Sequence, residues 1–133
     1  MIAAMKLSYF WLAALLLAGC AKPTPPSVAH KTIGDLEVSL TASSPPHVGD
    51  NMFSVTLADA VTHAPVGNAN ITANPEMLSH SGTGSPSSGR SQGNGLYQLP
   101  VRLGIATRYD INLHIERPGT PAANVSFPVE AAQ

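Results

Sequence analysis

From about residue 33 onward, hydrophobic and polar residues alternate in six short runs. Each run has Val, Leu, Ile, Phe, Tyr or Ala at every second position, with mostly polar or charged residues between them. Successive side chains of a β-strand point to opposite faces, so this pattern is typical of an antiparallel strand with one buried and one solvated face. The runs are DLEVSL (35–40), NMFSVTL (51–57), VGNANITA (66–73), LYQLPVRL (96–103), YDINLHIE (109–116) and NVSFPVE (124–130).

Gly, Pro, Asn and Ser separate these runs, and no helical period follows the first twenty residues. Six or seven short strands in about 100 residues predict an all-β domain, an antiparallel immunoglobulin-like β-sandwich of six to seven strands. Pro100 and Pro128 stand inside two of the runs. Proline cannot donate to a strand ladder, so we expect both at sheet edges, at edge-facing positions or in bulges.

The first nineteen residues read differently from the rest. Lys6 precedes an apolar stretch from Leu7 to Ala18, and Met5 is an alternative start that keeps this order. The stretch is shorter than the about 20 apolar residues that span a bilayer, and it has the length of a signal-peptide core. Residues 1–19 are therefore expected to be a signal helix that is removed.

The motif LAGC (17–20) closes this segment and resembles the lipobox of bacterial lipoproteins. The resemblance implies diacylation of Cys20 through a thioether, cleavage before it and acylation of the new amine. It therefore implies an envelope protein that faces the periplasm and is held on a lipid bilayer through Cys20. By the same resemblance Ala21, in the position where Asp retains enteric lipoproteins, favours the outer membrane over the inner one.

Residues 20–32 are rich in proline and polar residues, which predicts an extended linker that carries the domain of residues 33–130. At about 3 Å per residue the linker lifts the domain roughly 30 Å from the lipid surface.

Composition removes several classes of function. Cys20 is the one cysteine, so once it is lipidated no thiol remains for a nucleophile, a redox pair or a thiolate-ligated metal. Seven Lys and Arg balance eight Asp and Glu without a basic cluster. Nucleic acid is therefore not an expected partner, because binding it requires clustered cations.

The segment HVGDNMFSVTLADAVTHAPVGNANITA (47–73), followed by GNGLYQLPVRL and YDINLHI, resembles the YtkA-like and FixH-like group of small bacterial envelope domains. The resemblance implies an immunoglobulin-type fold with a Met- and His-bearing loop after the strand that ends near residue 73. It also implies, by analogy, a partner such as a metal-transport or respiratory complex.

One candidate chemistry is copper binding. Cu(I) favours thioether and imidazole ligands, and the sequence offers Met77 and His80 three residues apart, with Met52 and His47 as further candidates. His63 and His114 are also available, although His114 is expected on the wet face of its strand. Since Met is by default an adaptable packing residue, Met77 filling the end of the sandwich is the competing interpretation.

The loop from 81 to 95 is long, and such loops are either functional or disordered; its Gly- and Ser-rich composition favours disorder. It contains GRSQG (89–93), a literal match to the G-x-S-x-G nucleophile motif, without the strand-to-helix turn that activates the serine. No catalytic constellation is expected. The leading hypothesis is a non-enzymatic, lipid-anchored accessory or binding module for a protein partner or a small ligand, without a certain cofactor. The alternative is a periplasmic copper-binding or copper-tolerance protein.

Overall fold

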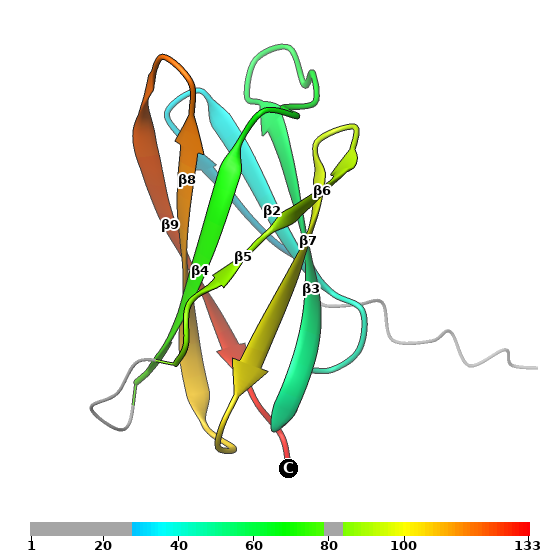
Figure 1. Cartoon of the computed structure of the whole chain (residues 1–133), viewed down its shortest axis with the longest axis vertical. Coiled ribbons are helices and arrows are strands. Elements are labelled where there is room, and N and C mark those ends of the chain that lie inside the picture. Colours follow the sequence, from blue (N-terminus) through cyan, green and yellow to red (C-terminus); the bar gives the residue numbers. More distant parts are fainter. Residues whose placement is uncertain (1–27, 79–83) are drawn as a thin grey trace, which may run out of the picture.

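The computed structural model describes residues 28–78 and 84–133, so Cys20, His80 and the predicted signal segment lie outside the described residues. Within those ranges the chain forms two antiparallel sheets packed face to face (Figure 1). The predicted all-β antiparallel sandwich is confirmed. No helix in the described part of the chain is long and apolar enough to cross a bilayer.

The strands divide into a five-stranded and a four-stranded sheet. The first has the order β1-β2-β3-β7-β6, and the second has the order β5-β4-β8-β9. The strands of the first sheet are β1 (Val28–Ile33), β2 (Leu36–Ala42), β3 (Gly49–Asp59), β7 (Leu96–Leu103) and β6 (Arg90–Gly93). Those of the second are β5 (Ser87–Ser88), β4 (Asn70–Met77), β8 (Arg108–Arg117) and β9 (Thr120–Glu130).

The core lies between the sheets and takes the inward positions that the alternation predicts. Its largest side chains are Tyr97, Tyr109, Phe53 and Phe127, which are almost fully buried. The Tyr97 hydroxyl donates to Val66 O at 2.8 Å and accepts from Ala69 N at 3.2 Å. A core residue therefore holds the segment before β4. Buried tyrosines need such partners, because an unpaired hydroxyl in the core is costly.

The structure differs from the predicted strands in three places. The run predicted to begin at residue 66 becomes a strand only at Asn70, because Gly67 and its neighbours form the loop that Tyr97 holds, and β4 then continues to Met77. The predicted linker of residues 20–32 overlaps β1. The loop from 81 to 95, for which disorder was predicted, contains β5 and β6.

The alternation of hydrophobic and polar residues does not reveal β1, because one of its inward positions holds a charged residue. Lys31 pairs with buried Val38 and therefore faces inward. Its ammonium group reaches the border of the opposite sheet, where it donates to Ser126 O and lies 5.4 Å from the centroid of the Phe127 ring. The aliphatic stem covers apolar surface while the charge finds a carbonyl and a ring face.

β5 and β6 are two halves of one extended segment that passes from the second sheet to the first (Figure 1). Gly89 lies between them and donates its amide to Ile71 O at 2.8 Å. A Cβ at Gly89 would lie 3.3 Å from the Ile71 Cβ, so glycine allows the two backbones to approach closely. This crossing covers part of one side of the sandwich.

Both strand prolines turn their ring nitrogens to the open side of a sheet. Leu57 N donates to Gly95 O, and because bonding alternates along a ladder, Pro100 of β7 faces away from β3. β6 pairs with β7 only as far as Gln98, so Pro100 faces an open edge. The bond from Ala131 N to Thr107 O places Pro128 on the free edge of β9 in the same way. The predicted edge-facing positions are confirmed, and both prolines hinder further strand addition.

Candidate functional site

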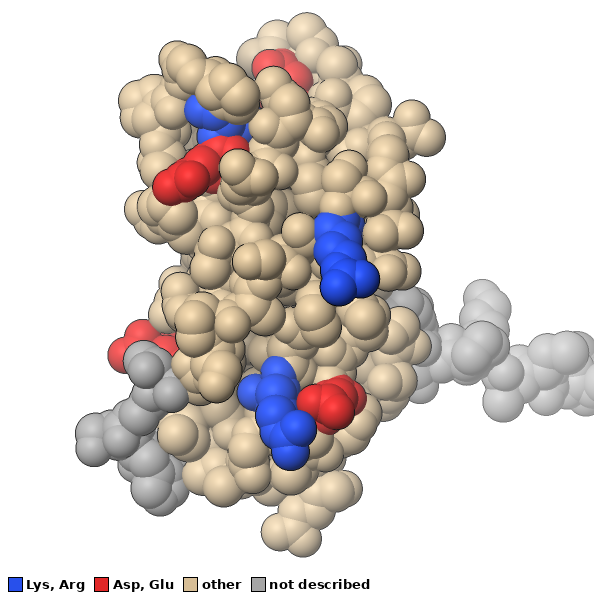
Figure 2. Space-filling model, viewed as in Figure 1, with Lys and Arg blue, Asp and Glu red and all other residues tan. Residues whose placement is uncertain are grey.

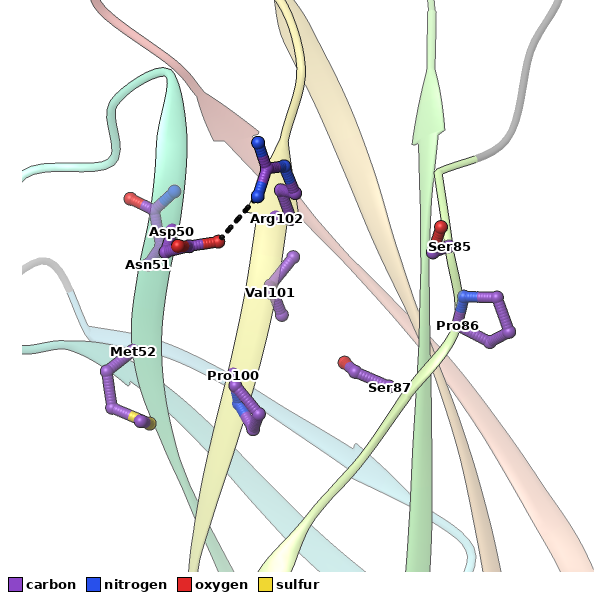
Figure 3. Close-up of a pocket in the computed structure, with 9 residues that line it drawn as sticks. All are labelled: Asp50, Asn51, Met52, Ser85, Pro86, Ser87, Pro100, Val101 and Arg102. Carbon is purple, nitrogen blue, oxygen red and sulfur yellow. Dashed lines mark ion pairs between the residues drawn. The ribbon is translucent and has the colours of Figure 1, made fainter.

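A cleft of about 340 Å³ lies beside the second half of β7. There the pairing with β6 has stopped, because Arg90, the first residue of β6, pairs with Gln98 and no residue of β6 pairs beyond it. It lies between β3 and β7 on one side and the segment before β5 on the other (Figure 3). Its lining residues are Asp50, Asn51, Met52, Ser85, Pro86, Ser87, Pro100, Val101 and Arg102. Its volume lies at the lower end of the range of small-ligand sites.

The surface of the cleft is mostly apolar, although five of its nine lining residues are polar or charged. The Met52 side chain is 43% exposed, and Pro86 and Pro100 supply rigid rings. Arg102 lies 3.5 Å from Asp50 at the end of the cleft (Figure 3), and since both side chains are well exposed this ion pair contributes little to stability. The arrangement suits a ligand that combines an apolar part with hydrogen-bonding groups.

Ser87 is the polar group that distinguishes the cleft. Its hydroxyl oxygen is buried and has no hydrogen-bond partner among the described residues. In Figure 3 the hydroxyl points toward β7, across the cleft. A buried hydroxyl without a partner costs about 1–3 kcal/mol, so such a group in a native structure calls for a ligand or a water molecule.

Asn51 fixes the wall of the cleft from behind. Its side-chain oxygen accepts from His47 N at 3.0 Å, and its amide nitrogen donates to His47 O at 2.8 Å and to Gly49 O at 3.1 Å. The buried amide thus holds the turn that leads into β3. Sequence reasoning missed this residue, although an Asn within a G-D-N turn is a known signal for side-chain to backbone bonding.

The predicted copper ligands do not come together in the described residues. Met77 is at the end of β4 and packs against the core between the sheets, whereas Met52 is on the outer face of β3. The first sheet therefore separates the two thioethers. The imidazole of His47 has its Nδ1 3.2 Å from Pro45 O, and His80 is outside the described residues. The copper site stays a prediction, without a converging set behind it.

His30 and His63 lie on either side of Glu37 on the outer face of the first sheet. The distances are 3.2 Å from His30 Nε2 to one carboxylate oxygen and 3.2 Å from His63 Nδ1 to the other. Ser39 Oγ lies 2.9 Å from His30 Nδ1. Within the described ranges no three His, Cys, Asp or Glu side chains form a group that could hold a metal ion. The cluster instead ties β1 and the turn after β3 to β2.

A second polar surface is the outer face of the second sheet. His114 Nδ1 lies 2.7 Å from Asn124 Oδ1, and its Nε2 lies 3.1 Å from a Glu116 oxygen. Asn112 donates to Glu76 at 3.1 Å and accepts from Ser126. These contacts satisfy the side chains among themselves. The hydrogen bond that the His114 ring donates to Asn124 Oδ1, followed by the one to Glu116, raises the pKa of His114 above its ordinary 6.5.

The raised pKa of His114 predicts a pH-dependent contribution to stability. A group whose pKa is higher in the folded state stabilises the fold fully below its unfolded pKa and loses this effect as the pH rises through the folded pKa. We expect the His114 imidazole to titrate above 6.5 in NMR spectra, and Asn124→Ala to lower that midpoint. His114→Gln should then reduce the melting temperature more at about pH 5 than at about pH 9. An equal reduction at both values would contradict the assignment.

The G-x-S-x-G match is part of an edge strand. GRSQG (89–93) covers the crossing glycine and β6, in which Ser91 is exposed and pairs with Tyr97. The motif activates serine on a strained strand-to-helix turn, and neither the helix nor that turn is present here.

Figure 2 shows that acidic and basic side chains are few and scattered on the face it displays.

Comparison with known proteins yields a structural relative. A crystal structure of a DUF4426 family protein from Pseudomonas aeruginosa PAO1 has a TM-score of 0.58 to this chain, at 17% sequence identity. The match covers 77% of this chain and 93% of that protein. At this identity the likeness establishes the β-sandwich fold alone. No family model and no curated protein matches the sequence.

Proposed function

We propose that this protein is a lipid-anchored lipoprotein of the bacterial envelope and a non-enzymatic binding module, whose cleft beside β7 takes a small ligand or a side chain of a protein partner. The observation that carries the binding role is the buried hydroxyl of Ser87, which has no partner among the described residues, in a cleft whose surface is mostly apolar. A ligand that accepts from or donates to this hydroxyl removes the cost of its burial.

The anchoring role is supported by the LAGC motif, since two or more acyl chains hold a protein stably on a bilayer. β1 begins at Val28, eight residues after Cys20. The linker therefore spans at most about 26 Å, which is shorter than residues 20–32 alone suggest. The resemblance to YtkA-like and FixH-like domains adds a partner of the metal-transport or respiratory-assembly kind, by analogy.

Site-specific photo-crosslinking in intact cells tests the binding role. A photoreactive amino acid at Met52 should form an adduct, whereas the same residue at Val61, which is 83% exposed in the turn after β3, should not. Ser87→Ala should weaken the Met52 adduct and leave the domain as stable or more stable by about 1 kcal/mol, because it removes an unsatisfied buried group. Equal adducts at both positions, or an adduct indifferent to Ser87→Ala, would count against this cleft.

A further inference from the structure

The end of the sandwich where β3 begins carries exposed hydrophobic side chains, and we name it the apolar end. Val48 is 38% exposed, Ile105 is 42% exposed, and Leu78, just after β4, is 53% exposed. A hollow of about 470 Å³ lies between Val48 and Ile105 and is lined by no charged side chain; its lining residues are Val48, Gly104, Ile105, Ala106 and Gln133. In Figure 1 this end lies at the bottom of the view, with the C-terminus.

The apolar end is held rigidly by hydrogen bonds to its backbone. The buried Tyr109 accepts from Ile105 N at 3.1 Å and donates to Ile105 O at 3.0 Å. Val48 N donates to Ala132 O at 2.9 Å, and Leu78 N donates to Arg108 O at 3.2 Å. The loops therefore present these side chains outward in a fixed arrangement, which is typical of a surface that meets a partner.

The opposite end carries the exposed side chains of Val61 and Leu96 among groups that are otherwise mostly polar. Arg117 donates to Asp35 at 2.8 Å there, and the Asp59 carboxylate accepts from the amides of Val61 and Thr62. The Arg117 hydrogen bond and charge hold the pKa of Asp35 below its usual 3.8, so that end keeps its charge. The end with Asp35, Arg117 and Asp59 therefore suits water, whereas the apolar end suits a less polar environment.

The position of β1 allows the apolar end to meet the lipid. β1 begins opposite Thr41, level with Ser54 in the middle of β3, and runs away from the apolar end. From Ser54 to Gly49 the strand covers about 17 Å. The eight residue steps from Cys20 to Val28 span up to about 26 Å, so the anchor can reach past either end of β3, the apolar end included.

We propose that the apolar end rests on the membrane, with Val48, Ile105 and Leu78 at the boundary between lipid head groups and acyl chains. The proposal builds on the lipid anchor at Cys20 proposed above. Lipid is the occupant that the anchor holds within reach, and apolar side chains bordered by charged groups, here Asp50 and Arg102, suit the boundary between acyl chains and head groups. The opposite end, with Asp35, Arg117 and Asp59, then faces the periplasm.

Fluorescence quenching in proteoliposomes tests this orientation. Since Cys20 is blocked by lipid, Val48→Cys, Ile105→Cys and Val61→Cys each give the full-length lipidated protein one free thiol for a fluorophore. With nitroxide lipids in vesicles of phosphatidylethanolamine and phosphatidylglycerol, we expect quenching at positions 48 and 105 to exceed that at 61 by about threefold or more. A second substitution, Ile105→Glu, should lower the quenching at position 48 while the protein stays on the vesicles.

The outcomes separate this proposal from the anchor itself. A protein that floats with the vesicles but is quenched equally and weakly at all three positions overturns the orientation and leaves the anchor intact. Shielding of positions 48 and 105 from an aqueous quencher, without nitroxide quenching, also overturns it, because a protein partner or a second copy then covers the apolar end. A lipidated preparation that does not float overturns the anchor and the orientation together.

Discussion

Gly95→Ala is expected to lower the free energy of unfolding by about 3 kcal/mol or more, among the largest effects that one methyl group can have. Gly95 has a φ of +73°, and a Cβ there would lie 2.5 Å from Leu57 O and 3.1 Å from Val66 N. Val66 N donates a hydrogen bond to Leu57 O at 3.0 Å, and Leu57 N donates one to Gly95 O at 2.8 Å. The backbone cannot move away without breaking these bonds.

Gly93→Ala is the matched control for this prediction. Gly93 has a φ of +87°, but a Cβ there would meet nothing within 4 Å. Its cost is therefore the backbone strain alone, about 1–2 kcal/mol. Urea unfolding of both variants gives the comparison. Similar losses in the two variants would show that the contact with Leu57 contributes nothing beyond strain.

Cys20→Ala is expected to abolish lipid labelling and to release nearly all of the protein from the membrane fraction. Each buried methylene of an acyl chain contributes about 0.8 kcal/mol, so removing every chain removes the whole affinity of the anchor. Metabolic labelling with a palmitate analogue and fractionation of the membranes measure the two effects. Ala21→Ser keeps the cysteine and should keep both. Labelling that persists in Cys20→Ala would refute the lipobox interpretation.

The buried faces of the strands were predictable because each inward residue is apolar. Leu36, Val38 and Leu40 alternate with polar neighbours, and all three are buried. β1 was missed because Lys31 occupies an inward place, and its reason for being there, the carbonyl of Ser126, is 95 residues away in the chain. Periodicity reads one strand at a time, so it cannot anticipate a contact between two sheets.

The candidate site was harder to predict than the fold. The cleft exists because β6 stops pairing at Gln98, and that depends on where Gly89 lets the chain cross between the sheets. Ser87 and its neighbours have no apolar pattern, so composition alone favoured disorder for a segment that the backbone ladders hold. Met52 was correctly placed on an outward face, but its surroundings in the cleft come from parts of the chain that no spacing rule connects.

The strand order of the first sheet also determines how the domain carries mechanical load. In the proposed anchored form, tension on the lipid tether enters the fold through β1, whose backbone pairs in the described residues with β2 alone, at six positions. A force along the strand loads the hydrogen bonds between β1 and β2 together in shear, and the Lys31 contact with β9 resists the same displacement. In that anchored form β1 is therefore the element that takes such a load first, before any other strand.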